Sequence, residues 1–161
     1  MSRVALPHDA KAGPTKSEVR AVLLGKLDLG SMDHFVEIGS CTGAVTVEAA
    51  RRAGRITALE RKPERLAVAE KNLAANDVTA DVELREAEAP EDLPEDADAL
   101  FLGGSRNDEA VLDHAVATGV GRLLSLVELA RFYLISTNRI AKIDTSRQQI
   151  PFGYHVAYRT W

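Results

Sequence analysis

The sequence lacks several features that would point to particular classes of protein. It contains one cysteine, Cys41, so an internal disulfide is excluded, and its four histidines are dispersed along the chain. No group of cysteines and histidines has the spacing of zinc ligands, and we therefore expect no metal site. No apolar run approaches the ~20 residues that a membrane span needs. The first fifteen residues also lack the hydrophobic core of a signal peptide, so we expect a cytoplasmic protein without a membrane partner.

An excess of positive charge is also missing. The chain has 20 basic and 24 acidic residues, a net charge of −4, which argues against a nucleic-acid-binding surface spread over the whole molecule. Hydrophobic residues make up 45% of the 161 residues, enough for the core of one domain. We find no repeat or linker, and we expect a single domain over residues 1–161. Residues 1–13 are polar and irregular, which indicates either a disordered segment or a flap that orders over a ligand.

Strands and helices are predicted to alternate along the chain. Thr15 and Glu18 have the spacing of a capping box, which predicts a helix that follows Thr15 and ends at Leu29. Further helices are predicted over 44–53, 63–76 and 107–118, and strands over 34–38, 55–60, 81–85, 97–102 and 121–129. Alternating segments at 139–147 and 154–161 predict a terminal hairpin. The expected fold is α/β: one mostly parallel, seven-stranded sheet with helices on both faces and a C-terminal antiparallel hairpin.

The most informative stretch joins the first predicted strand to its helix. Glycines at both ends of the turn, Gly39 and Gly43, allow a sharp bend and a close approach of the backbone to a ligand. The turn Gly39-Ser40-Cys41-Thr42-Gly43 differs by one residue from a pattern associated with S-adenosylmethionine. It differs by one residue from the dinucleotide-binding pattern as well, so the turn alone leaves both cofactors open.

Two carboxylates flank this turn. Glu60 ends the second predicted strand, close to the ~20-residue spacing of an acid that accepts hydrogen bonds from ribose hydroxyls. Glu37 precedes Gly39 by two residues, where a carboxylate would repel a pyrophosphate. S-adenosylmethionine instead carries a sulfonium and an ammonium group. Glu37 therefore favours S-adenosylmethionine over a dinucleotide.

Taken together, several segments resemble the cobalamin-pathway methyltransferases that act on precorrin-6Y or cobalt-precorrin-6B. These enzymes methylate carbon 15 and decarboxylate an acetate side chain. The most specific matches are residues 13–20, similar to the family's P-M-T-K-x-E-V-R, and residues 98–105, close to D-A-V-F-I-G-G-S. Residues 37–43, 47–50, 59–65, 72–73 and 88–91 are also similar to family segments.

The resemblance implies a Rossmann-like class I methyltransferase fold, S-adenosylmethionine as the cofactor, a small-molecule tetrapyrrole substrate and no nucleic acid. It also implies a homo-oligomer, a tetramer by analogy. No residue is assigned as a catalytic base. From charge and placement, Lys16 and Arg106 are candidates to meet substrate carboxylates. The cofactor-binding positions implied are Thr15, Glu37, Gly39, Ser40, Cys41, Thr42, Gly43, Glu60 and Ala89, and the substrate-facing positions are Gly103, Gly104, Ser105 and Arg106.

The chain departs from the family in two places. Cys41 stands where the family has a glycine, and the similarity weakens after Ser105. If the turn keeps its family shape, we expect a negative φ at Cys41 and a side chain that points away from the cofactor. A positive φ would favour a protein that binds S-adenosylmethionine without turnover. A methyltransferase that acts on RNA or protein and an NAD-dependent enzyme also stay open at this point.

Overall fold

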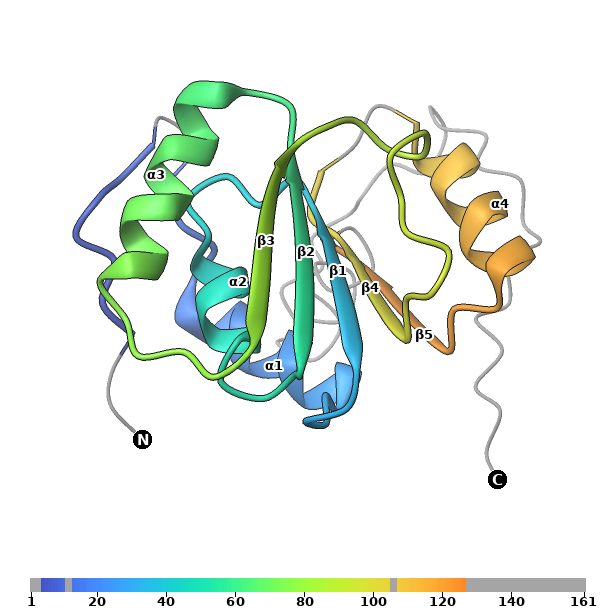
Figure 1. Cartoon of the computed structure of the whole chain (residues 1–161), viewed down its shortest axis with the longest axis horizontal. Coiled ribbons are helices and arrows are strands. Elements are labelled where there is room, and N and C mark those ends of the chain that lie inside the picture. Colours follow the sequence, from blue (N-terminus) through green and yellow to red (C-terminus); the bar gives the residue numbers. More distant parts are fainter. Residues whose placement is uncertain (1–3, 11–12, 105–106, 127–161) are drawn as a thin grey trace, which may run out of the picture.

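The computed structural model describes residues 4–10, 13–104 and 107–126, and within them strands and helices alternate (Figure 1). The helices are α1 (Ser17–Leu27), α2 (Ala44–Ala49), α3 (Pro63–Ala74) and α4 (Asp108–Thr118). The strands are β1 (His34–Ile38), β2 (Arg55–Glu60), β3 (Asp81–Glu86), β4 (Ala99–Leu102) and β5 (Arg122–Ser125). Among these residues, no helix has the length and apolar character that crossing a membrane requires.

The five strands form one parallel sheet in the order β3-β2-β1-β4-β5. This confirms the predicted parallel α/β sheet. The two predicted hairpin strands, 139–147 and 154–161, lie outside the described residues, so the total of seven strands stays a prediction. The strand order reverses beside β1, between β2 and β4. In open parallel sheets, ligands bind at such a reversal, beyond the carboxyl ends of the strands.

Successive residues of β1 point to opposite faces of the sheet and belong to two separate cores. On one face, Phe35 packs with Leu23 and Leu27 of α1 and with Ile56 of β2. On the other, Val36 and Ile38 pack with Val111 of α4 and with the loop between β3 and β4. Figure 1 shows α1, α2 and α3 on one side of the sheet and α4 on the other. Helices therefore cover both faces, as predicted.

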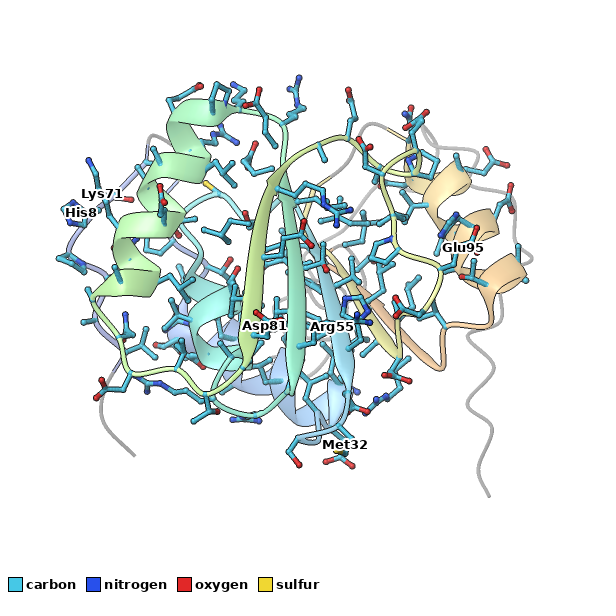
Figure 2. All side chains as sticks on the ribbon, in the orientation of Figure 1. His8, Met32, Arg55, Lys71, Asp81 and Glu95 are labelled. Atoms are coloured by element: carbon cyan, nitrogen blue, oxygen red, sulfur yellow. The ribbon has the colours of Figure 1, made fainter. Side chains whose placement is uncertain are left out.

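The acidic loop between β3 and β4 is anchored to the amino ends of β1 and β2, away from the reversal point. His34 Nδ1 lies 3.0 Å from Asp96 Oδ1, and its Nε2 lies 2.9 Å from the Thr57 hydroxyl. Arg55 pairs with Asp96 and holds the pKa of that carboxyl below its ordinary value. Figure 2 shows Arg55 near Asp81, its register partner on the neighbouring strand β3.

Two local predictions are wrong. The capping box predicted Thr15 as the N-cap of α1, but the helix begins at Ser17 with Lys16 at the capping position. The second helix was predicted to run from residue 44 to 53, yet α2 ends at Ala49. Beyond Ala49 the amides of Arg51 and Arg52 donate to the carbonyls three residues earlier, those of Glu48 and Ala49, at 3.4 and 2.9 Å. The predicted last turn is therefore a tighter turn than an α-helix.

Candidate functional site

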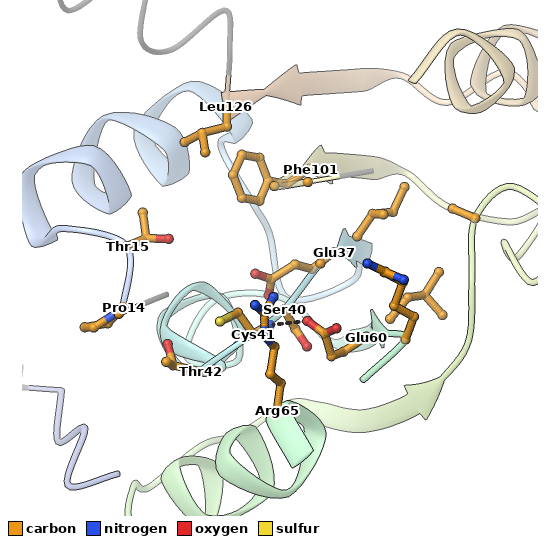
Figure 3. Close-up of a pocket in the computed structure, with 18 of the residues that line it drawn as sticks. Pro14, Thr15, Glu37, Ser40, Cys41, Thr42, Glu60, Arg65, Phe101 and Leu126 are labelled. Atoms are coloured by element: carbon orange, nitrogen blue, oxygen red, sulfur yellow. Dashed lines mark hydrogen bonds between the residues drawn. The ribbon is translucent and has the colours of Figure 1, made fainter. Parts of the chain in front are cut away.

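A cavity of about 560 Å³ opens where the strand order reverses (Figure 3). Its walls come from segments that are far apart in the sequence: residues 13–16 before α1, the turn 39–42 after β1, Glu60 at the end of β2, residues 87–89 after β3, and residues 103–104 after β4. Its volume lies within the ~300–1,000 Å³ of typical small-molecule sites.

Most of the predicted site residues meet at this cavity. The lining includes, among others, Thr15, Lys16, Glu37, Gly39, Ser40, Cys41, Thr42, Glu60, Ala89, Gly103 and Gly104. Gly43 is not among the lining residues and is instead packed against α3, where an added Cβ would lie 3.0 Å from the Ala69 Cβ. Ser105 and Arg106, predicted to face the substrate, lie outside the described residues. The structure thus brings together residues from five separate segments and gives Gly43 a packing role.

The backbone of the turn is fixed by both neighbouring strands. The amides of Gly39 and Ser40 donate to the Leu59 carbonyl of β2, at 2.8 and 3.1 Å. Gly39 has φ +81°, and a Cβ there would lie only 2.8 Å from the Gly104 carbonyl oxygen. A side chain at this position would therefore push the ends of β1 and β4 apart.

The two glycines after β4 are not equivalent. A Cβ at Gly103 would lie 3.1 Å from both the Ile38 carbonyl and the Phe101 ring, so its lack of a side chain serves packing. At Gly104 no atom lies within 4 Å of such a Cβ, and the residue borders the open cavity. Val19, Phe101 and Leu126 are apolar residues of the cavity lining, and Figure 3 shows Phe101 and Leu126 close to each other. Of the two glycines, only Gly104 leaves free space for a ligand.

Glu60 is buried, 4% exposed, and held by two backbone amides. Its Oε2 accepts from the Cys41 amide at 3.1 Å, and its Oε1 accepts from the Lys62 amide at 3.0 Å. Each carboxylate oxygen can accept a second hydrogen bond. Glu60 is therefore oriented in advance and retains the capacity to accept from a pair of hydroxyl groups.

Glu37 lies deeper, with 2% of its surface exposed. The Thr46 hydroxyl donates to its Oε2 at 2.5 Å. Burial raises the pKa of Glu37 to about 8, although the Thr46 hydrogen bond acts in the opposite direction. The carboxyl is therefore mostly protonated at neutral pH, and a cation placed beside it would favour its ionisation.

The prediction of a negative φ at Cys41 is wrong, because the residue has φ +50°. Its amide donates to Glu60 while the Gly43 amide donates to the Ser40 carbonyl at 2.7 Å, and these bonds hold the peptide in the left-handed region. A positive φ was expected to accompany loss of turnover. The hydrogen bonds account for this conformation, which suits the glycine that the resemblance implies at this position. Its half-buried thiol borders the cavity, and burial raises the pKa of this thiol.

An ion pair that was not predicted from the sequence positions Thr15. Arg20 is 7% exposed, and its Nε lies 2.6 Å from Glu48 Oε1 of the α2 segment. Arg20 also donates through Nη1 to the Thr15 carbonyl. Arg20 and Glu48 both lie in segments that resemble the family, at residues 13–20 and 47–50. The signal in the sequence was therefore a pair of opposite charges in two matched segments. Asn72, a buried residue of α3 that donates to the Thr42 carbonyl, was missed as well.

Replacing Arg20 should show how much its ion pair with Glu48 contributes to the stability of the fold. We expect Arg20→Ala to lower the free energy of unfolding by about 3 kcal/mol, because Glu48 and the Thr15 carbonyl lose their common donor. Arg85→Ala is the matched control, since its ion pair with Glu83 is exposed and should contribute less than about 1 kcal/mol. Urea unfolding of the three proteins measures both values, and equal losses for the two variants would contradict the assigned role of Arg20.

The left-handed conformation of Cys41 yields a second prediction. Cys41→Gly should raise the free energy of unfolding by about 1 kcal/mol or leave it unchanged, because glycine adopts positive φ without steric strain. Cys41→Ala keeps a Cβ and should show no such gain. Thermal unfolding of both variants gives the comparison, and a clear loss of stability in Cys41→Gly alone would argue against strain at this residue.

Comparison with known proteins places this chain in a family. A family model described as a precorrin methyltransferase domain matches residues 6–127. A probable cobalt-precorrin-6B C(15)-methyltransferase (decarboxylating) of Halobacterium salinarum is 56% identical, covering 99% of this chain and 88% of the relative. The chain spans about half the length of other curated relatives that it matches.

Solved structures of methyltransferases and of a precorrin decarboxylase share the fold. A precorrin 8W decarboxylase from Methanobacterium thermoautotrophicum is similar with a TM-score of 0.68 and 29% identity, over 83% of this chain and 77% of that one. An RNA methyltransferase from Salinibacter ruber, solved in complex with S-adenosyl-L-homocysteine, has a TM-score of 0.55 and 27% identity, over 62% of this chain and 66% of that one. On the combined family match and sequence identity, the chain belongs to the precorrin methyltransferase family.

Proposed function

We propose that the protein is an S-adenosylmethionine-dependent C-methyltransferase of cobalamin biosynthesis. It methylates carbon 15 of a precorrin or cobalt-precorrin and decarboxylates an acetate side chain. The observation that carries this proposal is the convergence of Thr15, the turn 39–42 and Gly103–Gly104 on one cavity, because these family-specific segments are distant in sequence. The name of the Halobacterium salinarum relative, which states this reaction, supports it.

The residues of the cavity fit an amphipathic, positively charged nucleoside. The Ser40 hydroxyl is buried and has no hydrogen-bond partner among the described residues, although buried polar groups are usually paired. Glu60 supplies acceptors, and Glu37 supplies negative charge once a bound cation favours its ionisation. In the proposed arrangement the turn 39–42 wraps the methionine end, Glu60 accepts from the ribose hydroxyls, and the backbone of Ala89 lies against the adenine.

Methyl transfer requires the protein mainly to orient the methyl donor and the acceptor. S-adenosylmethionine supplies an electrophilic methyl group on a positively charged sulfur. An in-line displacement needs the acceptor carbon, methyl and sulfur to be aligned, so positioning provides much of the rate acceleration and no strong base is obligatory. The open surface at Gly104 leaves room for the edge of a flat macrocycle, and Phe101 and Leu126 provide an apolar wall that excludes water. Lys16, which lines the same cavity, is placed to meet a substrate carboxylate.

The direct test follows both products of the reaction. The protein is incubated with methyl-labelled S-adenosylmethionine and a cobalt-precorrin-type substrate, and label transfer and release of carbon dioxide are measured. Appearance of both supports the proposal, and label transfer without carbon dioxide restricts it to methylation. If the protein bound S-adenosylhomocysteine but transferred no label, it would be a binding protein without turnover.

Two further parts of the proposal have different grounds. We infer a homo-oligomer, with a tetramer expected, from family analogy, and a cytoplasmic location from the sequence pattern. Light scattering coupled to gel filtration measures the assembly, and a monomer at all concentrations would contradict the first. An RNA-modifying activity would instead require tight RNA binding with a steep dependence on salt, which a filter-binding titration would reveal.

The raised pKa of Glu37 makes cofactor binding depend on pH. The positively charged groups of S-adenosylmethionine favour ionised Glu37, so binding lowers its pKa from about 8 and releases a proton. We expect the affinity to increase with pH, by at most about tenfold per unit, and to level off above about pH 8. Glu37→Gln should bind more weakly and lose this slope. Calorimetry in buffers of different ionisation enthalpy measures the released proton, and an affinity independent of pH would contradict the assignment.

The same shift predicts the stability of the ligand-free protein. Because the folded-state pKa lies above the ordinary value of 4.5, the folded protein retains a proton that the unfolded chain releases. The contribution of Glu37 to stability is therefore complete below about pH 4.5 and decreases as pH rises toward about 8. Thermal unfolding should show a smaller decrease for Glu37→Gln than for the unmodified protein over this interval.

A further inference from the structure

The N-terminal segment 4–10 runs along α3, as Figure 1 shows for the blue trace, and Figure 2 places His8 beside Lys71 of that helix. Two asparagines of α3, or just after it, attach this segment. Asn76 Oδ1 accepts from the Ala5 amide at 3.0 Å, and its Nδ2 donates to the Ala5 carbonyl at 2.7 Å. Asn72 Oδ1 accepts from the His8 amide at 3.0 Å, and its Nδ2 donates to the His8 carbonyl at 2.8 Å. Each side chain thus pairs with both backbone groups of one residue.

Asn72 makes a contact with the turn that Asn76 does not make. Its Nδ2 also donates to the carbonyl of Thr42, in the turn after β1, at 2.8 Å. An amide nitrogen has two hydrogens, so Asn72 gives one to the N-terminal segment and the other to the turn. Asn72 is fully buried, so the loss of either bond would leave a polar group without a water molecule to replace it.

The helix face that carries Asn72 also contacts the turn directly. Ala69 lies three residues earlier on the same face, and an added Cβ at Gly43 would come within 3.1 Å of its Cα. This packing leaves the turn little freedom to shift relative to α3. Gly13, Pro14 and Thr15, which come later in the sequence, line the same cavity as the turn. The side chain of Asn72 therefore holds both the turn and the segment that precedes this part of the lining in the sequence.

We propose that Asn72 is a positioning residue that couples docking of the N-terminal segment to ligand binding at the turn 39–43. A ligand that fixes the Thr42 carbonyl also fixes Asn72, and through it the backbone of His8. By thermodynamic reciprocity, docking of the segment raises the affinity of the turn by the same factor. The inference rests on the proposed function, because it takes S-adenosylmethionine or its product as the ligand.

A pair of matched variants tests this coupling. Asn72→Asp removes the donors to His8 and Thr42, and Asn76→Asp removes comparable donors to Ala5 and to the Asn72 carbonyl, which is 2.7 Å away. The probe is S-adenosylhomocysteine, titrated by calorimetry into the full chain. We expect Asn72→Asp to raise its Kd about tenfold or more, and Asn76→Asp to change it by less than about threefold.

Amide hydrogen exchange supplies a readout that a merely structural role would not change. In the unmodified protein, S-adenosylhomocysteine should slow exchange of the His8 amide, which lies outside the lining of the cavity. In Asn72→Asp this effect should disappear even at saturating ligand. A ligand effect on His8 that survives in a folded Asn72→Asp protein would overturn the proposal, as would equal losses of affinity in the two aspartate variants.

Two substitutions at exposed residues of the N-terminal segment test the coupling if Asn72→Asp does not fold. His8→Pro removes the amide that donates to Asn72, and Ala5→Pro removes the one that donates to Asn76, so the conformational effect of proline is present in both variants. We expect His8→Pro to weaken S-adenosylhomocysteine binding several-fold and Ala5→Pro to leave it unchanged. An unchanged Kd in His8→Pro would overturn the coupling. If the unmodified protein itself does not bind the ligand, the proposed function fails first and is recognised as the cause.

Discussion

The site depends on the contact between the ends of β1 and β4, where two backbones meet without side chains. A Cβ at Gly39 would overlap the carbonyl of Gly104, so only glycine permits this approach. The contact brings the turn after β1 next to the segment after β4. The turn can then reach across to β2, where Leu59 accepts two of its amides and Glu60 a third. The cavity forms because the ends of β1 and β4 lie this close together at the point where the strand order reverses.

Side chains outside the sheet stabilise the walls of the cavity through hydrogen bonds to backbone groups, and they do not line the cavity themselves. Arg20 fixes the carbonyl of Thr15 and is itself fixed by Glu48. Asn72 performs the same task for His8 and Thr42 on the other side. Arg20, Glu48 and Asn72 do not line the cavity, yet they determine where its walls lie. A substitution at any of them would be expected to alter binding geometry without removing a contact to the ligand.

The sequence predicted features that local patterns determine. The parallel sheet followed from the alternation of strands and helices, and the positions of Glu37 and Glu60 followed from their places at strand ends. Prediction failed where a distant partner intervenes. Thr15 has the pattern of a helix cap, but its backbone is held by the side chain of Arg20. The φ of Cys41 was mispredicted because the hydrogen bond to Glu60 depends on β2, which the turn sequence does not encode.

The buried carboxyl of Glu37 has a consequence for the end of the catalytic cycle. On the proposed function, methyl transfer converts a positively charged sulfur into a neutral thioether. The charge that favours ionised Glu37 is therefore reduced at the moment when product forms, and the pKa of Glu37 shifts back toward about 8. Uptake of a proton by Glu37 then weakens its attraction for the ammonium group of the spent cofactor. The same residue that strengthens binding of the donor would thus promote departure of the product and limit product inhibition.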